Sequence, residues 1–235
     1  MTAPRIPAGP EATERAAAVV RGGGLVITRT ATNYNVVCDA TSESAVRRVF
    51  QAKKRVKLGP LPVSLPYPSD IPTYVQIPDT FDTAAFDALL PGEVSFIFWQ
   101  KYPFPEQLTC GLHTVAVSCT SDPVFRALVK GAGGPVAATS ANLSGQGNIF
   151  VGLDKAVADL GDEVDLIVDA GETEAAASPD HADRVNTIVD FTFDQPYLCR
   201  PGWVATSEIE KYVPDLVVDR DTYSELLARR AAAAG

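Results

Sequence analysis

The sequence predicts a single α/β domain built on a mixed, twisted sheet. Short apolar segments typical of strands alternate along the chain with amphipathic segments of helical spacing, and no internal repeat is present. No linker divides the 235 residues, of which 46% are hydrophobic and 21% charged. That balance is typical of a globular chain. We expect residues 1–10, which are rich in proline, to be flexible, and residues 11–213 to form the domain, followed by a C-terminal helical tail at residues 214–235.

Helices are expected where apolar residues recur with helical spacing between capping residues. Residues 11–21 are rich in alanine, acidic at the start and basic at the end, and a run of three glycines ends them. Residues 42–54 carry one apolar face behind Ser42, a suitable N-cap. Further helices are expected at residues 83–90, 123–130, 153–160, 207–211 and 222–230.

Strands are expected where short apolar runs stand between turn residues. The first is residues 25–27, directly after the three glycines, and the longest apolar run is residues 94–100. The other expected extended segments are residues 60–65, 114–117, 136–138, 164–168, 186–191 and 196–199. The proline-rich residues 66–80 and the polar residues 172–184 predict loops.

Charge and composition restrict the classes of function. The chain has 20 Lys and Arg against 29 Asp and Glu, a net charge of −9, which argues against stable binding to nucleic acid. No apolar run approaches the roughly 18 residues of a membrane span, and residues 1–15 lack a signal-peptide core. Four scattered cysteines and two histidines favour reduced thiols in a cytoplasmic protein, with no metal held by protein side chains alone.

A basic cluster stands out in this acidic chain. Lys53, Lys54, Arg55 and Lys57 follow the second expected helix. Cations are favourable at any helix C-terminus, so the cluster is either a solvated helix end or a clamp for phosphates.

Residues 139–145 follow the strand expected at residues 136–138 and are mostly small hydroxyl and amide residues. We call this segment the hydroxyl turn. Such a turn offers N–H groups and short polar side chains to a phosphate or sugar, although many ordinary turns share this composition. Arg200 ends another expected strand, and an isolated arginine is usually a surface ion pair. Because no residue stands in a recognisable nucleophile setting, any catalysis would depend on positioning and electrostatics.

Taken in order, these features resemble the YrdC-type threonylcarbamoyl-AMP synthase family over residues 22–212. The hydroxyl turn is similar to the family signature Thr-Ser-Ala-Asn-x-Ser-Gly, and four elements recur in the family's order. The other three are Lys53-Lys54-Arg55 with Pro60-Leu61 (Lys-x-Arg and Pro-Leu), Arg200-Pro201-Gly202 (Arg-x-Gly) and Asp39-Ala40 (Asp-Ala).

The resemblance implies an open twisted sheet with flanking helices around a deep concave pocket. It also implies condensation of threonine, bicarbonate and ATP, with Mg²⁺, into threonylcarbamoyl-AMP and pyrophosphate for tRNA modification, with Lys53 and Arg55 as catalytic residues. The residues implied on the ATP side are Lys53, Arg55, Thr139, Ser140, Asn142, Ser144 and Arg200. Those implied on the acceptor side are Thr30, Thr32, Tyr34, Ser64, Ser118 and Asn186.

Departures from the family pattern gather on the acceptor side. Ser118 stands where the family has an arginine directed toward the amino acid, and Glu93 stands in place of a proline. Arg29 is a candidate to replace that arginine. Three hypotheses follow: a synthase that uses threonine, the same adenylation with another amino-acid or amine acceptor in specialised metabolism, and a non-catalytic protein that binds a nucleotide or RNA.

Overall fold

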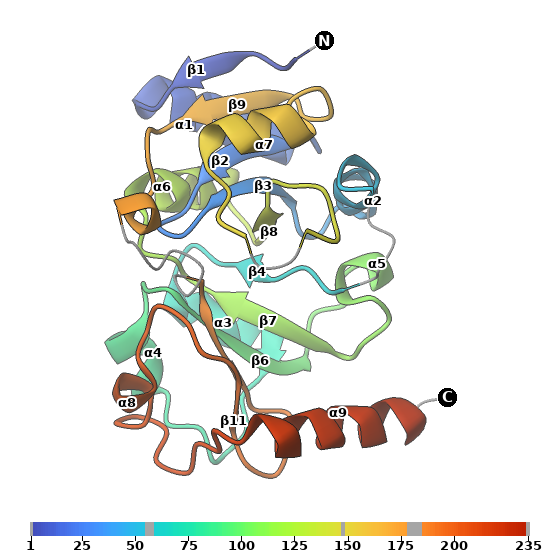
Figure 1. Cartoon of the computed structure of the whole chain (residues 1–235), viewed down its shortest axis with the longest axis vertical. Helices are drawn as coiled ribbons and strands as arrows, with labels where there is room; N and C mark the ends of the chain where they lie inside the picture. Colours follow the sequence, from blue (N-terminus) through green and yellow to red (C-terminus); the bar gives the residue numbers. More distant parts are fainter. Residues whose placement is uncertain (1, 55–58, 147–148, 178–184, 234–235) are drawn as a thin grey trace.

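The computed structural model describes residues 2–54, 59–146, 149–177 and 185–233, and it confirms the open, mixed α/β sheet. The sheet runs in the order β1-β9-β2-β3-β8-β4-β7-β6-β10-β11, and β5 pairs with β6 (Figure 1). The strands are β1 (Arg5–Pro7), β2 (Val26–Arg29), β3 (Tyr34–Asp39), β4 (Val63–Ser64), β5 (Val75–Gln76), β6 (Val94–Gln100), β7 (Thr114–Ser118), β8 (Val136–Ser140), β9 (Leu166–Asp169), β10 (Thr187–Asp190) and β11 (Tyr197–Arg200).

Helices cover both faces of the sheet. The α-helices are α1 (Pro10–Arg21), α2 (Glu43–Ala52), α3 (Ile71–Tyr74), α4 (Ala84–Leu89), α5 (Glu106–Thr109), α6 (Pro123–Ala132), α7 (Leu153–Leu160), α8 (Thr206–Ile209) and α9 (Arg220–Ala233). Two short 3₁₀ helices are η1 (Pro68–Asp70) and η2 (Glu174–Ala177). Among the described residues, no helix has both the length and the apolar composition that crossing a bilayer requires.

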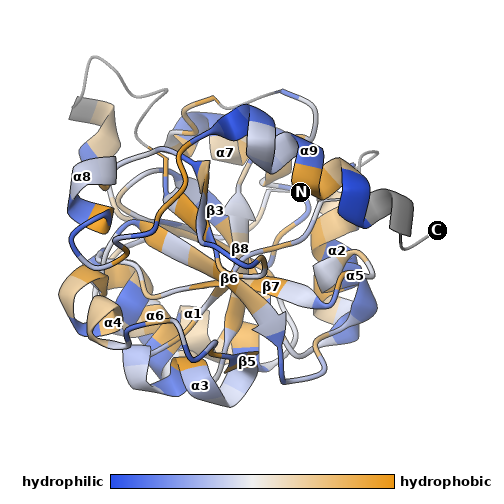
Figure 2. Cartoon of the chain, turned by 90° about the horizontal axis from the view of Figure 1, so that it is seen from below, coloured by the Kyte–Doolittle hydropathy of each residue, from blue (hydrophilic) through white to orange (hydrophobic). Residues whose placement is uncertain are grey.

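Strand β3 shows how the alternation of side chains divides the core. Val37 packs with α1 and α6 on one face, whereas Val36 and Cys38 belong to the larger cluster that includes α2 and α7 on the other face. Ser42 caps α2 by accepting a hydrogen bond from the N–H of Ala45, as the sequence predicts. Seen from below, β6 is largely hydrophobic at the centre of the molecule, and α9 at the rim carries hydrophilic residues (Figure 2).

The two-residue strand β4 joins the two halves of the sheet. It pairs antiparallel with β8 and parallel with β7, with Ser64 opposite both Val136 and Ser118. On the far side, β10 pairs parallel with β6 and antiparallel with β11, where Ile188 lies opposite Arg200. These registers bring residues far apart in the chain to one surface of the sheet.

Two parts of the chain differ from the sequence-based expectation. Residues 1–10 were expected to be flexible, but β1 pairs parallel with β9, and Arg5 forms an ion pair with Asp169 at 2.8 Å. Strand β3 was not expected, because its polar ends hide a short apolar centre. It lies between β2 and β8, where both edges are hydrogen-bonded.

Candidate functional site

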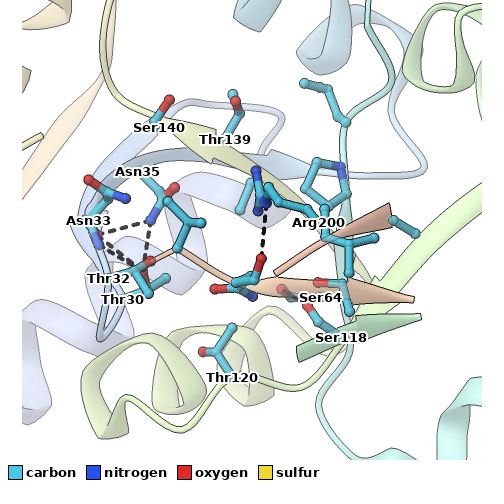
Figure 3. A pocket seen from close by; sticks show the side chains of 18 of the residues that line it. Thr30, Thr32, Asn33, Asn35, Ser64, Ser118, Thr120, Thr139, Ser140 and Arg200 are labelled. Atoms are coloured by element: carbon cyan, nitrogen blue, oxygen red, sulfur yellow. Dashed lines mark hydrogen bonds between the residues drawn. The ribbon is translucent and has the colours of Figure 1, made fainter. Parts of the chain in front are cut away.

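A cavity of about 510 Å³ lies at the junction of the two halves of the sheet. Its volume is within the range of small-molecule sites. Arg200 is the one charged residue among the described residues that line it. The lining hydroxyl residues come from strands and loops far apart in the chain, and they are Thr30, Thr32, Ser64, Ser95, Ser118, Thr120, Thr139 and Ser140 (Figure 3).

The hydroxyl turn forms one side of the cavity, with Thr139 and Ser140 at its lining. Within the turn, Ser140 Oγ donates a hydrogen bond to Asn142 Oδ1 at 2.7 Å. The Nδ2 of Asn142 donates to the carbonyl of Leu143 and to the side chain of Gln146, so this buried amide shapes the turn. Asn142 and Ser144 are not among the residues that line the cavity.

Lys53 holds the hydroxyl turn from behind. Its side chain is buried, and its ammonium donates hydrogen bonds to the carbonyl oxygens of Ser140 and, at 2.7 Å, of Asn142. The N–H of Ser144 in turn donates to the carbonyl of Lys53 at 3.0 Å. Lys53 is therefore placed beside the turn rather than at the cavity lining. Arg55 and Lys57, which complete the basic cluster, lie outside the described residues.

Arg200, at the end of β11, brings positive charge to the cavity. Its Nε donates to the carbonyl oxygen of Asn186 at 3.0 Å, which fixes the guanidinium (Figure 3). Burial lowers the pKa of Arg200, but an arginine stays charged in proteins. Because Arg200 forms no ion pair within the described residues, its charge is open to an anionic ligand.

Five of the six residues expected on the acceptor side line the cavity: Thr30, Thr32, Ser64, Ser118 and Asn186. The first two share a hydrogen bond at 3.2 Å, and the two serine hydroxyls share one at 3.0 Å. All four side chains are buried, and within each pair one hydroxyl fixes the orientation of the other.

Tyr34, the sixth residue expected on the acceptor side, is not at the cavity lining. Its buried hydroxyl donates to the carbonyl of Gly171 at 2.7 Å and accepts from the N–H of Ala170. Burial raises the pKa of this hydroxyl. Tyr34 therefore ties β3 to the loop that follows β9.

Arg29 does not replace the arginine that is missing at position 118. Its Nε pairs with Asp122 Oδ2 at 3.0 Å, and its guanidinium also donates to the carbonyl of Glu172. Asp122 is buried and caps α6 by accepting from the N–H groups of Val124 and Phe125. The charge of Arg29 is thus used to hold α6.

Sequence reasoning missed several residues of the site. Alternate residues of a strand face the same side of the sheet. Thr120 therefore lies on the same side as Ala116 of β7, and Ser95 lies on the same side as Ile97 of β6, and all four line the cavity. That period is the signal by which they could have been found.

The buried thiol of Cys119 is not suited to act as a nucleophile, since burial raises its pKa to about 12. No cluster of three metal-ligating side chains occurs within the described part of the chain.

Together the fold and the cavity define an open-sheet α/β protein with a hydroxyl-lined pocket, in which an arginine is the one charged residue among the described lining residues. The Sua5/YciO/YrdC family model, described as telomere recombination, matches residues 18–202, and the chain belongs to this family. The resemblance expected from the motifs is thereby confirmed.

Relatives in this family carry a named activity. A threonylcarbamoyl-AMP synthase of Pyrococcus abyssi is 29% identical over 211 residues, which cover 89% of this chain and 59% of that protein. The crystal structure of P. abyssi Sua5 complexed with L-threonine matches with a TM-score of 0.83 and 27% identity, over 95% of this chain and 64% of that one. Escherichia coli YciO shares the fold, with a TM-score of 0.72 and 20% identity over 88% of this chain and 99% of its own.

Proposed function

We propose that the chain condenses an amino acid, bicarbonate and ATP into a carbamoyl-adenylate and pyrophosphate, with threonine as the acceptor. The P. abyssi relative is named for this product, and the similar P. abyssi Sua5 structure is described as complexed with L-threonine. The chain spans 59% of the length of that relative, so the activity is a proposal for the present chain. The product would serve tRNA modification, as the family resemblance implies.

One observation carries the proposal: the hydroxyl turn and Arg200 face the same cavity. A triphosphate needs a cation and several hydrogen-bond donors close together, and these residues supply both. The hydroxyls of Thr139 and Ser140 would hold phosphate or ribose oxygens. Arg200 would offset the charge that develops on the leaving pyrophosphate.

The protein's part in the reaction is to orient the reactants. The amine and bicarbonate form a carbamate with loss of water, and an oxygen of this carbamate attacks the α-phosphate and displaces pyrophosphate. No nucleophilic side chain is needed, because holding the two reactants close together lowers the barrier strongly. Mg²⁺ would arrive bound to ATP and neutralise phosphate charge, since the described lining residues include no carboxylate. Lys53 would act through the turn, by holding the carbonyl groups of Ser140 and Asn142 in place.

A second candidate keeps the adenylation and changes the acceptor. The observation in its favour is at Ser118, whose hydroxyl is paired with Ser64 and offers no charge to a carboxylate. A charged pair at that position would contribute about 1.5–3 kcal/mol to binding an amino acid. An acceptor without a carboxylate would lose nothing there.

Pyrophosphate release tests both candidates. The full chain is incubated with Mg-ATP, bicarbonate and each of a panel of amino acids and amines, and the adenylate is identified by mass spectrometry. Release that requires bicarbonate and is fastest with threonine supports the main proposal. Faster release with another amine supports the second candidate, and no release above background with any acceptor refutes both.

A further inference from the structure

Two buried oxygen atoms near one end of the cavity lack hydrogen-bond partners within the described residues. They are Thr120 Oγ1 and Glu93 Oε2, on residues that are 5% and 3% exposed. Leaving such an atom unpaired costs about 1–3 kcal/mol, and folded proteins pair nearly all of them. An unpaired oxygen at a cavity wall is therefore a place where a ligand can supply the missing donor.

Thr120 belongs to the cavity wall, and Glu93 supports it from behind. Figure 3 shows Thr120 on the side of the cavity opposite Thr139 and Ser140. The next residue, Ser121, donates hydrogen bonds to Glu93 Oε1 from its backbone N–H at 3.0 Å and from its hydroxyl at 2.8 Å. Glu93 thereby fixes the backbone immediately after Thr120.

The charges around this end of the cavity are mostly negative. Asp122 and Glu174 lie close enough to raise the pKa of Glu93, in addition to the larger effect of burial. Of the nearby cations, Arg29 is paired with Asp122, and Arg126 acts on the neighbouring Cys119 together with the opposing charge of Asp70. Arg200 lies on β11, away from this end. A cationic group is therefore favoured beside Thr120, whereas an anion is favoured beside Arg200.

We propose that Thr120 is a binding residue for the amino group of the acceptor molecule, and that Glu93 is the residue that positions it. The hydroxyl oxygen of Thr120 accepts a hydrogen bond from an N–H of the amine, and the acidic surroundings attract the ammonium form as the acceptor binds. The ammonium then gives one proton to solvent before the neutral amine forms the carbamate with bicarbonate. The phosphates of ATP then lie toward Arg200. This inference rests on the proposed function, since that reaction requires an acceptor amine in the cavity.

A binding titration without ATP tests Thr120. L-threonine, L-serine and L-lysine are each compared with the matching acid that lacks the α-amino group, using NMR of the full chain. Thr120→Val keeps the shape and removes the hydroxyl. Thr28→Val is the matched control, because Thr28 Oγ1 is also buried and unpaired within the described residues but is not at the cavity lining.

We expect the wild type to bind at least one amino acid better than its deaminated counterpart. Thr120→Val should weaken that amino acid about tenfold and leave the counterpart unchanged, as loss of one hydrogen bond to a charged group predicts. Thr28→Val should change neither. Equal weakening of both ligands, no weakening, or a wild type without any preference for the amine overturns the inference.

Glu93→Gln separates positioning from a general structural role. It keeps the shape and removes the charge. We expect the KM for the acceptor to rise about tenfold while the KM for ATP stays unchanged. An equal rise in both KM values, or no change, contradicts the assignment of Glu93. Absence of pyrophosphate release from the wild type refutes the proposed function, and the binding titration still decides the role of Thr120.

Discussion

The ammonium group of Lys53 donates a hydrogen bond to the carbonyl oxygen of Ser140, 87 residues further along the chain. A second bond reaches the carbonyl of Asn142, so the end of α2 and the hydroxyl turn form one unit. The side chain is 4% exposed, which is rare for a lysine. Lys53 therefore contributes to the site by holding the hydroxyl turn, which differs from direct contact with phosphate.

Replacing Lys53 should therefore destabilise the fold as well as the site. Lys53→Met leaves the buried carbonyl of Asn142 and the part-buried carbonyl of Ser140 with one partner fewer each, and we expect a loss of about 2–4 kcal/mol in the free energy of unfolding. Urea denaturation followed by circular dichroism measures it. Lys54→Met, at an exposed neighbouring position, is the control and should change stability by less than about 0.5 kcal/mol. Equal stabilities of the two variants would contradict the role of Lys53 in holding the hydroxyl turn.

Arg200 should govern affinity for the nucleotide without carrying the fold. Arg200→Lys keeps a charge but loses the planar fork, and we expect ATP to bind about 10- to 100-fold more weakly in calorimetry. Arg229→Lys is the control, because its side chain is 76% exposed and far along α9. Unchanged ATP affinity in Arg200→Lys would mean that the triphosphate binds elsewhere.

Glu93 should make the stability of the protein depend on pH. Burial, the largest cause, raises its pKa above the ordinary value of 4.5, so the folded state binds more protons than the unfolded state in the window above that value. Its contribution is complete below pH 4.5 and is lost as the pH rises through the raised pKa. Compared with the wild type, Glu93→Gln should thus gain relative stability as the pH rises above about 4.5 and through the raised pKa of Glu93. Parallel stability curves for the two proteins would show that the Glu93 pKa is not raised.

The C-terminal helix should be held to the sheet by one buried hydrogen bond in particular. The hydroxyl of Tyr223 donates to Asp190 Oδ2 at 2.9 Å, and both residues are buried. Tyr223→Phe should cost about 1–3 kcal/mol of unfolding free energy, because a buried carboxylate loses a donor. Tyr67→Phe, at a tyrosine that is 49% exposed, is the matched control. A loss no greater than that of the control would show that the Tyr223 hydrogen bond does not hold α9, and would leave the hydrogen bonds from Arg230 to Thr192 and packing to do so.

Local patterns in the sequence predict the elements that dominate the site. The strand before Thr139 and the strand that ends at Arg200 are apolar runs followed by turn residues, so both could be found without coordinates. The same patterns do not reveal in which direction a long side chain points. The sequence is equally compatible with Lys53 facing a phosphate or facing the carbonyl of Ser140.

Residues that depend on distant neighbours were harder to predict. Thr120 keeps the two-residue period of β7 but lies two positions beyond the end of that strand, and the period alone does not show that a cavity formed by distant segments lies on that side. Tyr34 belongs to a motif near the acceptor side, but its hydroxyl is used by the backbone at Gly171. Both outcomes follow from tertiary contacts between segments that are far apart in the sequence.

We propose above all that the hydroxyl turn and Arg200 bind one triphosphate in a shared cavity. A crystal structure of the chain with a non-hydrolysable ATP analogue and Mg²⁺ tests this most directly. We predict phosphate oxygens within hydrogen-bond distance of Arg200 and of Thr139 or Ser140, with the opposite end toward Thr120 left open for the acceptor. A nucleotide bound outside the cavity, or with its phosphates directed away from Arg200, would contradict the claim.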